Sequence, residues 1–286
     1  MDLIQETKFI MNKYNITASK SLGQNFLIDS EVVSGIVDNA EVSKEDLIIE
    51  IGPGLGTLTS LLLERAGKVI CIELDKRMVN IITDRFSLYE NFEVINEDVL
   101  KVPLKSIIED NLKMHNLKNA KVVANLPYYI TTPIIMKLLE DRLNLQSITV
   151  MVQKEVAERL TETPGGKETG AITYSINYFA DSEIVIQVPN TSFIPAPEVN
   201  SAVMKLTLLD KPRVRVKDEK NLFNIIKIAF MQKRKTLVNS LKNGNILDGK
   251  ESIEKMLTEL NIDLKARAEN LTLEQFAQIA DYVENT

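Results

Sequence analysis

The chain has 286 residues, of which 44% are hydrophobic and 26% charged, and a formal net charge of −6, values typical of a globular protein. A single cysteine, Cys71, excludes an intrachain disulfide, and a single histidine, His115, excludes a His-based triad and most zinc sites. The first residues are too acidic for a secretory signal and no apolar run approaches the ~18 residues of a membrane span, so we expect a cytoplasmic protein without membrane contact.

The first half of the chain alternates between two patterns. After an arm of residues 1–28, apolar residues at helical spacing in 32–37 predict a helix. Short apolar runs then predict buried strands, separated by segments of helical periodicity; the runs are 47–51, 69–72, 92–95, 121–124 and 148–152. Strand–helix alternation of this kind indicates an α/β fold with a mostly parallel, doubly wound sheet.

Later segments have fewer helices between them and are predicted as strands that pair antiparallel at one edge of the sheet; they are 172–178, 183–188 and 202–208. The composition shifts at Lys211, and from there the periodicity is helical throughout. We therefore expect three regions: an arm (1–28), an α/β domain (29–210) and a small all-helical domain (211–286).

A glycine-rich loop, Gly52-Pro53-Gly54-Leu55-Gly56, follows a predicted strand and precedes a predicted helix. Glycines at such a place allow a tight turn and close approach of a ligand. Glu73 ends the next strand, where a carboxylate can accept hydrogen bonds from two ribose hydroxyls. A dinucleotide and S-adenosylmethionine both fit this pattern, and a turn without a ligand is the alternative.

Asp98 lies just past the third predicted strand, where its carboxylate is placed to accept from an adenine amino group. An aspartate after a strand also commonly caps a helix, so both interpretations stay open at this position.

Asn125-Leu126-Pro127-Tyr128 follows the fourth predicted strand. Ligands of open parallel sheets bind beyond the carboxyl ends of the strands, so this motif is expected in one crevice with Gly52, Glu73 and Asp98. The exocyclic amine of adenine is a poor nucleophile, and two acceptors, the Asn125 side-chain oxygen and the Leu126 carbonyl, would make its nitrogen more pyramidal. Pro127 stiffens the turn, and Tyr128 offers a face on which the base can stack. A turn with a surface tyrosine is the alternative.

In these motifs the chain resembles the ribosomal RNA adenine N6,N6-dimethyltransferases, relatives of the erythromycin-resistance methylases. The resemblance extends from about Lys20 through the helical tail. It is carried by the glycine loop and the Asn125 motif together with three further segments, which are 22–27 (Leu-Gly-Gln-Asn-Phe-Leu), 153–159 (Gln-Lys-Glu-Val-Ala-Glu-Arg) and 193–203 (Phe-Ile-Pro-Ala-Pro-Glu-Val-Asn-Ser-Ala-Val).

The resemblance implies a class I (Rossmann-like) methyltransferase sheet with a small helical domain. It implies S-adenosylmethionine as cofactor, with no metal, and S-adenosylhomocysteine as product. The residues that the match places at the cofactor are Asn25, Leu27, Gly52, Gly54, Glu73, Asp98 and Asn125. Phe193 would be a second aromatic near the target base, or else a core residue that anchors its loop.

The implied reaction is dimethylation of two adjacent adenosines near the 3′ end of 16S RNA in the assembling 30S subunit, by a monomer. The segment from Lys205 to Lys242 carries eleven Lys or Arg against three Asp or Glu, whereas the segment from Glu31 to Asp110 carries eight against sixteen. Such a basic segment is typical of a polyanion-binding face. The candidate phosphate contacts are Lys20, Lys154, Arg159, Lys233, Arg234 and Lys235, each of which is alternatively an ordinary solvated side chain.

Two positions depart from the family pattern: Lys233 stands where an arginine is more common, and Thr169 where an aromatic is expected. A resistance-type methylase of large-subunit RNA is the runner-up function. An assembly factor that mainly binds, and a nicotinamide-dependent oxidoreductase, are the alternatives of other classes.

Overall fold

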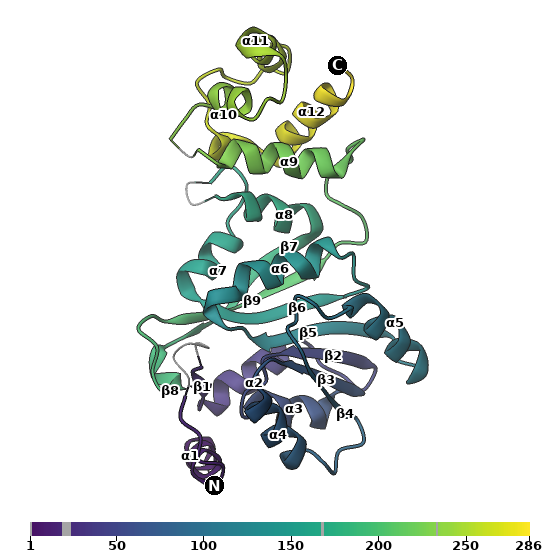
Figure 1. Ribbon diagram of the computed structural model, residues 1–286, viewed down its shortest axis with the longest axis vertical. Coiled ribbons are helices and arrows are strands. Elements are labelled where there is room, and N and C mark those ends of the chain that lie inside the picture. The colour runs from purple at the N-terminus through teal and green to yellow at the C-terminus, as the bar shows by residue number, and fades with distance from the viewer. Residues whose placement is uncertain (1, 19–23, 167–168, 233) are drawn as a thin grey trace. The chain divides into compact units, whose positions relative to one another are not determined.

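The computed structural model describes residues 2–18, 24–166, 169–232 and 234–286. The chain divides into two compact units, Met1–Ala157 with Glu183–Leu208, and Glu158–Ser182 with Leu209–Thr286 (Figure 1). The sequence predicted domain limits after residues 28 and 210, and these domain limits stay a prediction.

A mixed sheet, seven-stranded within the described residues, has the strand order β4-β3-β2-β5-β6-β9-β7. Its strands are β2 (Asp46–Ile51), β3 (Lys68–Glu73), β4 (Phe92–Asn96), β5 (Asn119–Asn125), β6 (Ser147–Gln153), β7 (Ala180–Val188) and β9 (Ser201–Leu208). The first five run parallel, whereas β9 pairs antiparallel with β6, with Met204 opposite Val150. The five predicted parallel strands and the predicted antiparallel strand over 202–208 are confirmed.

The burial of the strands follows from their place in the sheet. Every residue of β2 and β3 is buried, because helices or neighbouring segments cover both faces of an interior parallel strand. β4 lies at the edge and alternates between half-buried and exposed residues. The unbroken apolar runs of the interior strands are thus the signature of a parallel sheet.

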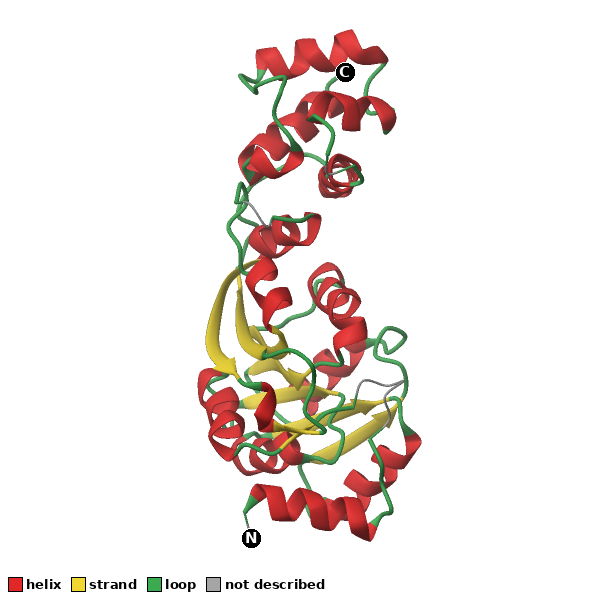
Figure 2. Ribbon diagram, turned by 90° about the vertical axis from the view of Figure 1, so that its left-hand side faces the viewer, coloured by secondary structure: helices red, strands yellow, loops and turns green. Residues whose placement is uncertain are grey.

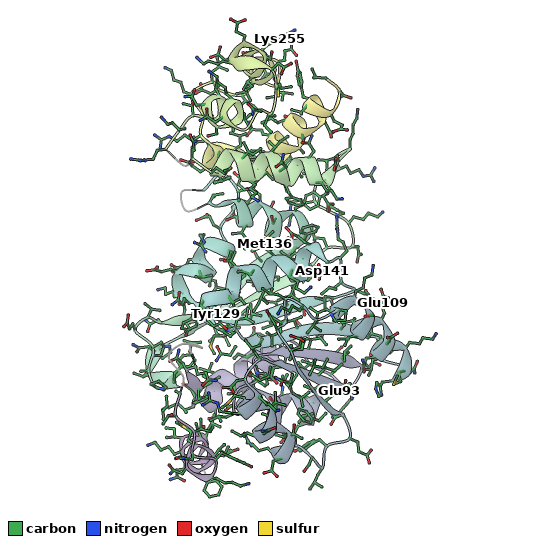
Figure 3. All side chains as sticks on the ribbon, in the orientation of Figure 1. Glu93, Glu109, Tyr129, Met136, Asp141 and Lys255 are labelled. Atoms are coloured by element: carbon green, nitrogen blue, oxygen red, sulfur yellow. The ribbon has the colours of Figure 1, made fainter. Side chains whose placement is uncertain are left out.

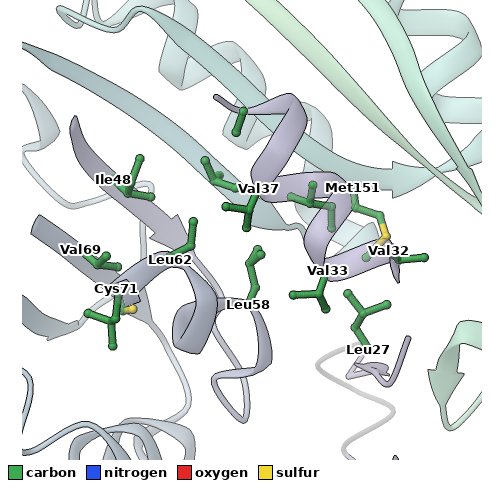
Figure 4. Close-up of a cluster of buried hydrophobic side chains, with 14 of the residues drawn as sticks. Leu27, Val32, Val33, Val37, Ile48, Leu58, Leu62, Val69, Cys71 and Met151 are labelled. Carbon is green, nitrogen blue, oxygen red and sulfur yellow. The ribbon is translucent and has the colours of Figure 1, made fainter. Parts of the chain in front are cut away.

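One face of the sheet is covered by α2 (Ser30–Asn39), α3 (Thr57–Arg65) and the end of α4 (Lys76–Arg85). Their side chains share a core cluster with strand residues such as Val69 and Met151 (Figure 4). α2 begins where Asp29 accepts hydrogen bonds from the backbone amides of the first turn. Burying this face fixes the loops that connect the strands to the helices.

The remaining elements of the first unit surround the sheet. They are α1 (Leu3–Lys13), β1 (Phe26–Leu27), α5 (Leu104–Met114), η2 (Tyr128–Ile130), α6 (Thr131–Glu140), η3 (Asn190–Ser192) and β8 (Phe193–Ile194); α7 (Lys154–Leu160) crosses the division between the units. β1 pairs antiparallel with β8, so that Leu27 lies opposite Phe193. α1 was not predicted from the sequence.

The second unit is helical, with α8 (Ala171–Phe179), α9 (Glu219–Phe230), α10 (Leu237–Asn243), α11 (Gly249–Glu259), η4 (Ala268–Asn270) and α12 (Leu273–Glu284) (Figure 2). Tyr174 is fully buried at its centre, where the hydroxyl donates to the carbonyl of Leu271 at 2.6 Å and the ring meets Phe276 edge-on at 5.0 Å. The helices predicted after residue 211 are confirmed. Within the described ranges, no helix is both long and apolar enough to cross a membrane.

The strand predicted over 172–178 is wrong, because these residues form α8. A hydrogen bond of 3.1 Å from the Gly170 amide to Oγ1 of Thr173 closes the first turn. Most of α8 is buried, and a short apolar run that is buried on several sides has no clear periodicity. Length and burial alone therefore could not separate this helix from a strand.

Candidate active site

A cavity opens at the carboxyl ends of β2, β3, β4 and β5. It is lined by residues that follow these four strands and by part of the N-terminal arm; they are 24–27, 50–55, 57–58, 72–74, 97–99, 125–130 and Ile134. The expected crevice of Gly52, Glu73, Asp98 and Asn125 therefore exists. This is the position at which an open parallel sheet binds its ligand.

The glycine loop takes a backbone conformation that side chains rarely adopt. Gly52, Gly54 and Gly56 have φ of 68°, 58° and 84°. A Cβ on Gly52 would lie 3.7 Å from the ring of Pro127, so the loop passes directly beside the Asn125 motif. A Cβ on Gly56 would lie 2.5 Å from the Phe86 ring. The loop thus needs glycine for its turn and for its close packing.

Glu73 closes the loop against the next strand. Its Oε2 accepts from the amide of Gly54 at 3.3 Å, and its Oε1 accepts from the amide of Asp75 at 2.8 Å. The side chain is buried, and this burial raises the pKa of Glu73 in spite of the two amide donors. Because each carboxylate oxygen has capacity for a further donor, Glu73 can accept from a pair of ribose hydroxyls.

Asp98 is half-buried and lines the cavity beyond β4. Its Oδ1 accepts from the amide of Leu100 at 3.0 Å and so caps the turn that follows the strand. The capping role considered from the sequence is therefore present. It leaves the carboxylate at the cavity wall, where it can accept from a further donor.

The backbone of the Asn125 motif is held in place on both sides. The amide of Leu126 donates to the carbonyl of Met151 at 3.1 Å, and the Leu126 side chain is buried. Pro127 has φ −60° and ψ 129°, and its carbonyl accepts from the amide of Ile130 and from Oγ1 of Thr131, each at 3.2 Å. The turn at Pro127 is therefore fixed by hydrogen bonds on both sides.

Asn125 and Tyr128 both line the cavity. No hydrogen bond is made to the Asn125 carboxamide by any residue that the structure describes, so its oxygen is available to a ligand. The Tyr128 hydroxyl lies 2.6 Å from Oγ of Ser201, and burial raises the pKa of Tyr128. Tyr129, by contrast, is 58% exposed (Figure 3).

Glu50 is a site residue that the sequence did not single out. It lines the cavity and is 1% exposed, with Oγ1 of Thr59 donating at 2.6 Å and Sγ of Cys71 at 3.4 Å. Burial raises the pKa of Glu50 to about 7. The signal that was available is an acidic residue inside the otherwise apolar run 47–51, since buried carboxyls are uncommon and often functional.

The charge of the cavity wall has one sign. The acidic lining residues are Glu50, Glu73, Glu97 and Asp98, and the described lining contains no lysine or arginine. Such a wall disfavours the diphosphate of a dinucleotide and suits a ligand with hydroxyl donors and a positive charge.

The N-terminal arm contributes residues to the cavity and others to the core. Asn25 and Leu27, which the resemblance assigns to the cofactor, line the cavity. Phe193 is brought next to Leu27 by the β1–β8 pair, but its side chain is 2% exposed, belongs to the core cluster and does not line the cavity. The geometry thus brings Tyr128 to the cavity and leaves Phe193 out of it.

The candidate phosphate contacts lie in both units. Lys154 is an exposed residue of the first unit, whereas Arg159 is half-buried, and Arg234 and Lys235 exposed, in the second. Lys20 and Lys233 lie outside the described residues. Thr169 is buried, with its hydroxyl donating to the Thr163 carbonyl at 3.3 Å.

The single histidine is not part of a metal-binding cluster among the described residues. His115 is exposed at the end of α5, as expected. In the part of the chain that the structure describes, no group of three or more His, Cys, Asp or Glu side chains is placed to hold a metal ion.

The chain is similar to known proteins that methylate ribosomal RNA. The profile of the family described as "Ribosomal RNA adenine dimethylase" matches residues 15–285. The ribosomal RNA small subunit methyltransferase A of Alkaliphilus oremlandii is 46% identical over 277 residues, which cover 97% of this chain and 96% of that protein.

Two solved structures share the fold. A dimethyladenosine transferase from Plasmodium falciparum superposes with a TM-score of 0.73 at 27% identity, over 89% of this chain and 95% of that one. The 23S rRNA methyltransferase ErmE superposes with a TM-score of 0.67 at 24% identity, over 91% and 100%. The predicted class I methyltransferase sheet with its C-terminal helical region is thereby confirmed. The chain belongs to the ribosomal RNA adenine dimethylase family, a family of S-adenosylmethionine-dependent methyltransferases.

Proposed function

We propose that this enzyme methylates N6 of two adjacent adenosines near the 3′ end of 16S RNA in the assembling 30S subunit, giving N6,N6-dimethyladenosine. The relative from A. oremlandii, named as a small-subunit methyltransferase and 46% identical over nearly the whole chain, supports the choice of subunit. The observation that carries the chemistry is the acidic cavity that places Glu73 and the Asn125 motif at one sheet edge. The proposal includes a cytoplasmic monomer that needs no metal.

The residues present fit S-adenosylmethionine, which supplies an electrophilic methyl group on a positively charged sulfonium. Glu73 would accept from the ribose hydroxyls, and Asp98 from the adenine amino group. Asn25, Leu27, Gly52 and Gly54 would form the remaining walls. The four carboxyls at the cavity wall favour a cationic group and disfavour a diphosphate, since the described lining has no lysine or arginine to offset them.

The target amine would be oriented by the Asn125 motif. The Asn125 oxygen and the Leu126 carbonyl would accept its two N–H groups, which directs the nitrogen lone pair toward the methyl group. The rigid turn at Pro127 holds both acceptors, and the Tyr128 ring would stack on the base. No general base is needed before attack, because the proton can leave the alkylated nitrogen afterwards.

RNA binding would be shared between the cavity rim and the basic segment. The side chains of Lys154, Arg234 and Lys235 are exposed and would contact phosphates, and Arg159, Lys20 and Lys233 are further candidates. We also propose that the helices from residue 211 onward serve mainly this binding, because that region carries the positive balance of the chain. Phe193, as a buried residue, would support the loop that precedes Ser201 rather than meet the base.

The test is methyl transfer from labelled S-adenosylmethionine to purified, undermethylated 30S and 50S subunits. We expect label in the 30S subunit alone, recovered after digestion as N6,N6-dimethyladenosine. Asn125→Ala should abolish the transfer. S-adenosylhomocysteine should still stabilise this variant against heat, but by less than the wild type, because Asn125 is also a proposed cofactor contact. Label found in the 50S subunit alone would favour the resistance-type reaction, and assembly that proceeds normally with Asn125→Ala would show that binding is the required role.

A further inference from the structure

The first helix precedes the residues that the family profile matches. The match begins at residue 15, whereas α1 spans Leu3–Lys13. The helix begins where Asp2 accepts from the amide of Gln5 at 2.7 Å, and it buries Thr7 and Ile10. Because α1 is capped and buries one face, it packs against other elements of the first unit. Its contacts extend to the glycine loop.

An apolar cluster joins α1 to the cavity. Ile10 of α1 packs in one cluster with residues of α4, of the N-terminal arm and of the glycine loop; its buried members are Ile10, Ile16, Phe26, Leu55, Met78 and Ile81. Both Phe26 and Leu55 also line the cavity. The Phe26 ring lies where a Cβ on Gly54 would be 3.6 Å away. The cluster therefore connects α1 to two walls of the proposed cofactor site.

A single guanidinium makes the polar connection. Arg85, at the end of α4, donates from Nη2 to Oε1 of Glu6 at 2.6 Å and from Nη1 to the carbonyl of Leu55. Its side chain is 14% exposed and lies over the Phe86 ring, 5.1 Å from the ring centre. Arg85 thus satisfies a carboxylate of α1 and a carbonyl of the glycine loop at the same time.

The Leu55 carbonyl, which accepts from Arg85, lies within the part of the glycine loop that contacts Glu73. Leu55 stands between Gly54, whose amide binds Glu73, and Gly56, which packs against Phe86. Both glycines have positive φ, so this stretch has little intrinsic preference for the conformation it takes. Fixing the Leu55 carbonyl therefore restricts the amide that orients the Glu73 carboxylate.

We propose that Arg85 is a positioning residue, which ties α1 to the glycine loop and thereby sets the loop conformation that binds S-adenosylmethionine. The inference rests on the proposed function, because it takes this cavity as the cofactor site. The guanidinium itself lies behind the loop and need not touch the cofactor.

The experiment measures S-adenosylhomocysteine binding to the full-length protein by calorimetry, at a temperature where every variant is folded. Arg85→Met keeps the length and apolar contacts of the side chain but removes both hydrogen bonds. We expect its dissociation constant to rise roughly tenfold, the loss of a hydrogen bond from a charged group. In methyl transfer, KM for S-adenosylmethionine should rise while kcat changes less than twofold.

The matched control is Asp84→Asn, one residue away. Asp84 also joins α4 to the end of α1, by accepting from the Tyr14 hydroxyl and from Nζ of Lys13 at 3.2 Å, but these two hydrogen bonds are exposed and neither involves the glycine loop. Its dissociation constant should stay within twofold of the wild type. Equal affinity for Arg85→Met and the wild type would overturn the inference, whereas a wild type that binds no S-adenosylhomocysteine would overturn the proposed function instead.

A charge-reversed pair separates the carbonyl contact from the ion pair. Glu6→Arg combined with Arg85→Glu allows an ion pair between α1 and α4, but a glutamate cannot donate to the Leu55 carbonyl. We expect the thermal midpoint of the double variant to exceed that of Arg85→Met, with affinity still reduced. Recovery of full affinity in the double variant would show that the ion pair alone is sufficient, and would refute the role assigned to the Leu55 contact.

Discussion

The amide of Gly54 donates a hydrogen bond of 3.3 Å to Oε2 of Glu73, which joins the glycine loop to the end of the next strand. The same carboxylate accepts from the amide of Asp75 through Oε1. Two backbone amides thus orient one buried carboxylate before any ligand arrives. Preorganisation of this kind lowers the entropy that binding would otherwise cost.

Glu73→Gln should weaken cofactor binding strongly. The amide of glutamine turns one acceptor into a donor, which then opposes either a backbone amide or a ribose hydroxyl. A lost hydrogen bond to a charged group amounts to about 1.5–3 kcal/mol, so the dissociation constant of S-adenosylhomocysteine should rise about 10- to 100-fold. The measurement is isothermal calorimetry.

Glu93→Gln is the control for this experiment. Glu93 lies on β4 and pairs with Lys68 at 3.2 Å, away from the cavity lining. Its removal should leave the affinity unchanged, because neither Glu93 nor Lys68 lines the cavity. Comparable losses in both variants would contradict the role of Glu73.

Tyr128 should act through its ring more than through its hydroxyl. The hydroxyl lies 2.6 Å from Oγ of Ser201, which places it away from a base that stacks on the ring face. Tyr128→Phe and Ser201→Ala should each lower kcat/KM only a few-fold. Tyr128→Ala removes the stacking surface, worth about 1–3 kcal/mol per base, and should lower kcat/KM by roughly 5- to 150-fold. If Tyr128→Phe is as impaired as Tyr128→Ala, the hydroxyl and not the ring carries the role.

Titration of Glu50 should make the protein less stable as the pH rises. Most carboxyls in proteins act in the opposite direction and reduce stability as the pH falls. Its pKa rises from 4.5 to about 7 on folding because the side chain is buried. A raised folded-state pKa means that the protonated form is favoured in the fold. The stabilisation is therefore complete below about pH 4.5, is lost as pH rises through about 7, and amounts to the order of 3 kcal/mol for this shift.

Glu50→Gln removes this titration and tests it. The free energy of unfolding, measured with denaturant from pH 4.5 to pH 8, should decline with rising pH in the wild type relative to the variant. Because all other groups titrate in both proteins, the difference isolates Glu50. A difference that stays constant over this range would contradict a buried carboxyl that titrates near neutrality.

Much of the sheet and of the cavity follows from local sequence. The runs around Ile49 and Ile70 are unbroken and apolar because both strand faces are covered, and this predicts parallel strands. Since the carboxyl ends of such strands share one edge, Glu73 and Asn125 could be placed together without coordinates. That inference needs only strand order, not side-chain packing.

Other features depend on contacts that distant residues make. The helix α1 is held by Arg85, 79 positions after Glu6, and no local pattern announces that contact. Phe193 was expected near the base, but its pairing with Leu27 in a two-stranded ribbon turns it into the core. Glu50 is noticeable in the sequence as a carboxylate within an apolar run, but its raised pKa follows only from its burial in the fold.

The basic segment contains two neighbouring exposed cations whose contact with RNA can be tested. Arg234 and Lys235 are exposed at the turn before α10. If both meet phosphates, Arg234→Ala combined with Lys235→Ala should weaken binding to the RNA substrate at low salt, and should reduce the slope of log K against log[salt] by about 1.4–1.8, since each contact contributes about 0.7–0.9. The matched control removes two charges from α11, with Lys250→Ala and Lys255→Ala, side chains that pair with Glu254 and Glu259. The slope of the control should equal that of the wild type. An equal change in both double variants would mean that net charge, and not a phosphate contact at this turn, governs binding, because removing any two positive charges would then have the same effect.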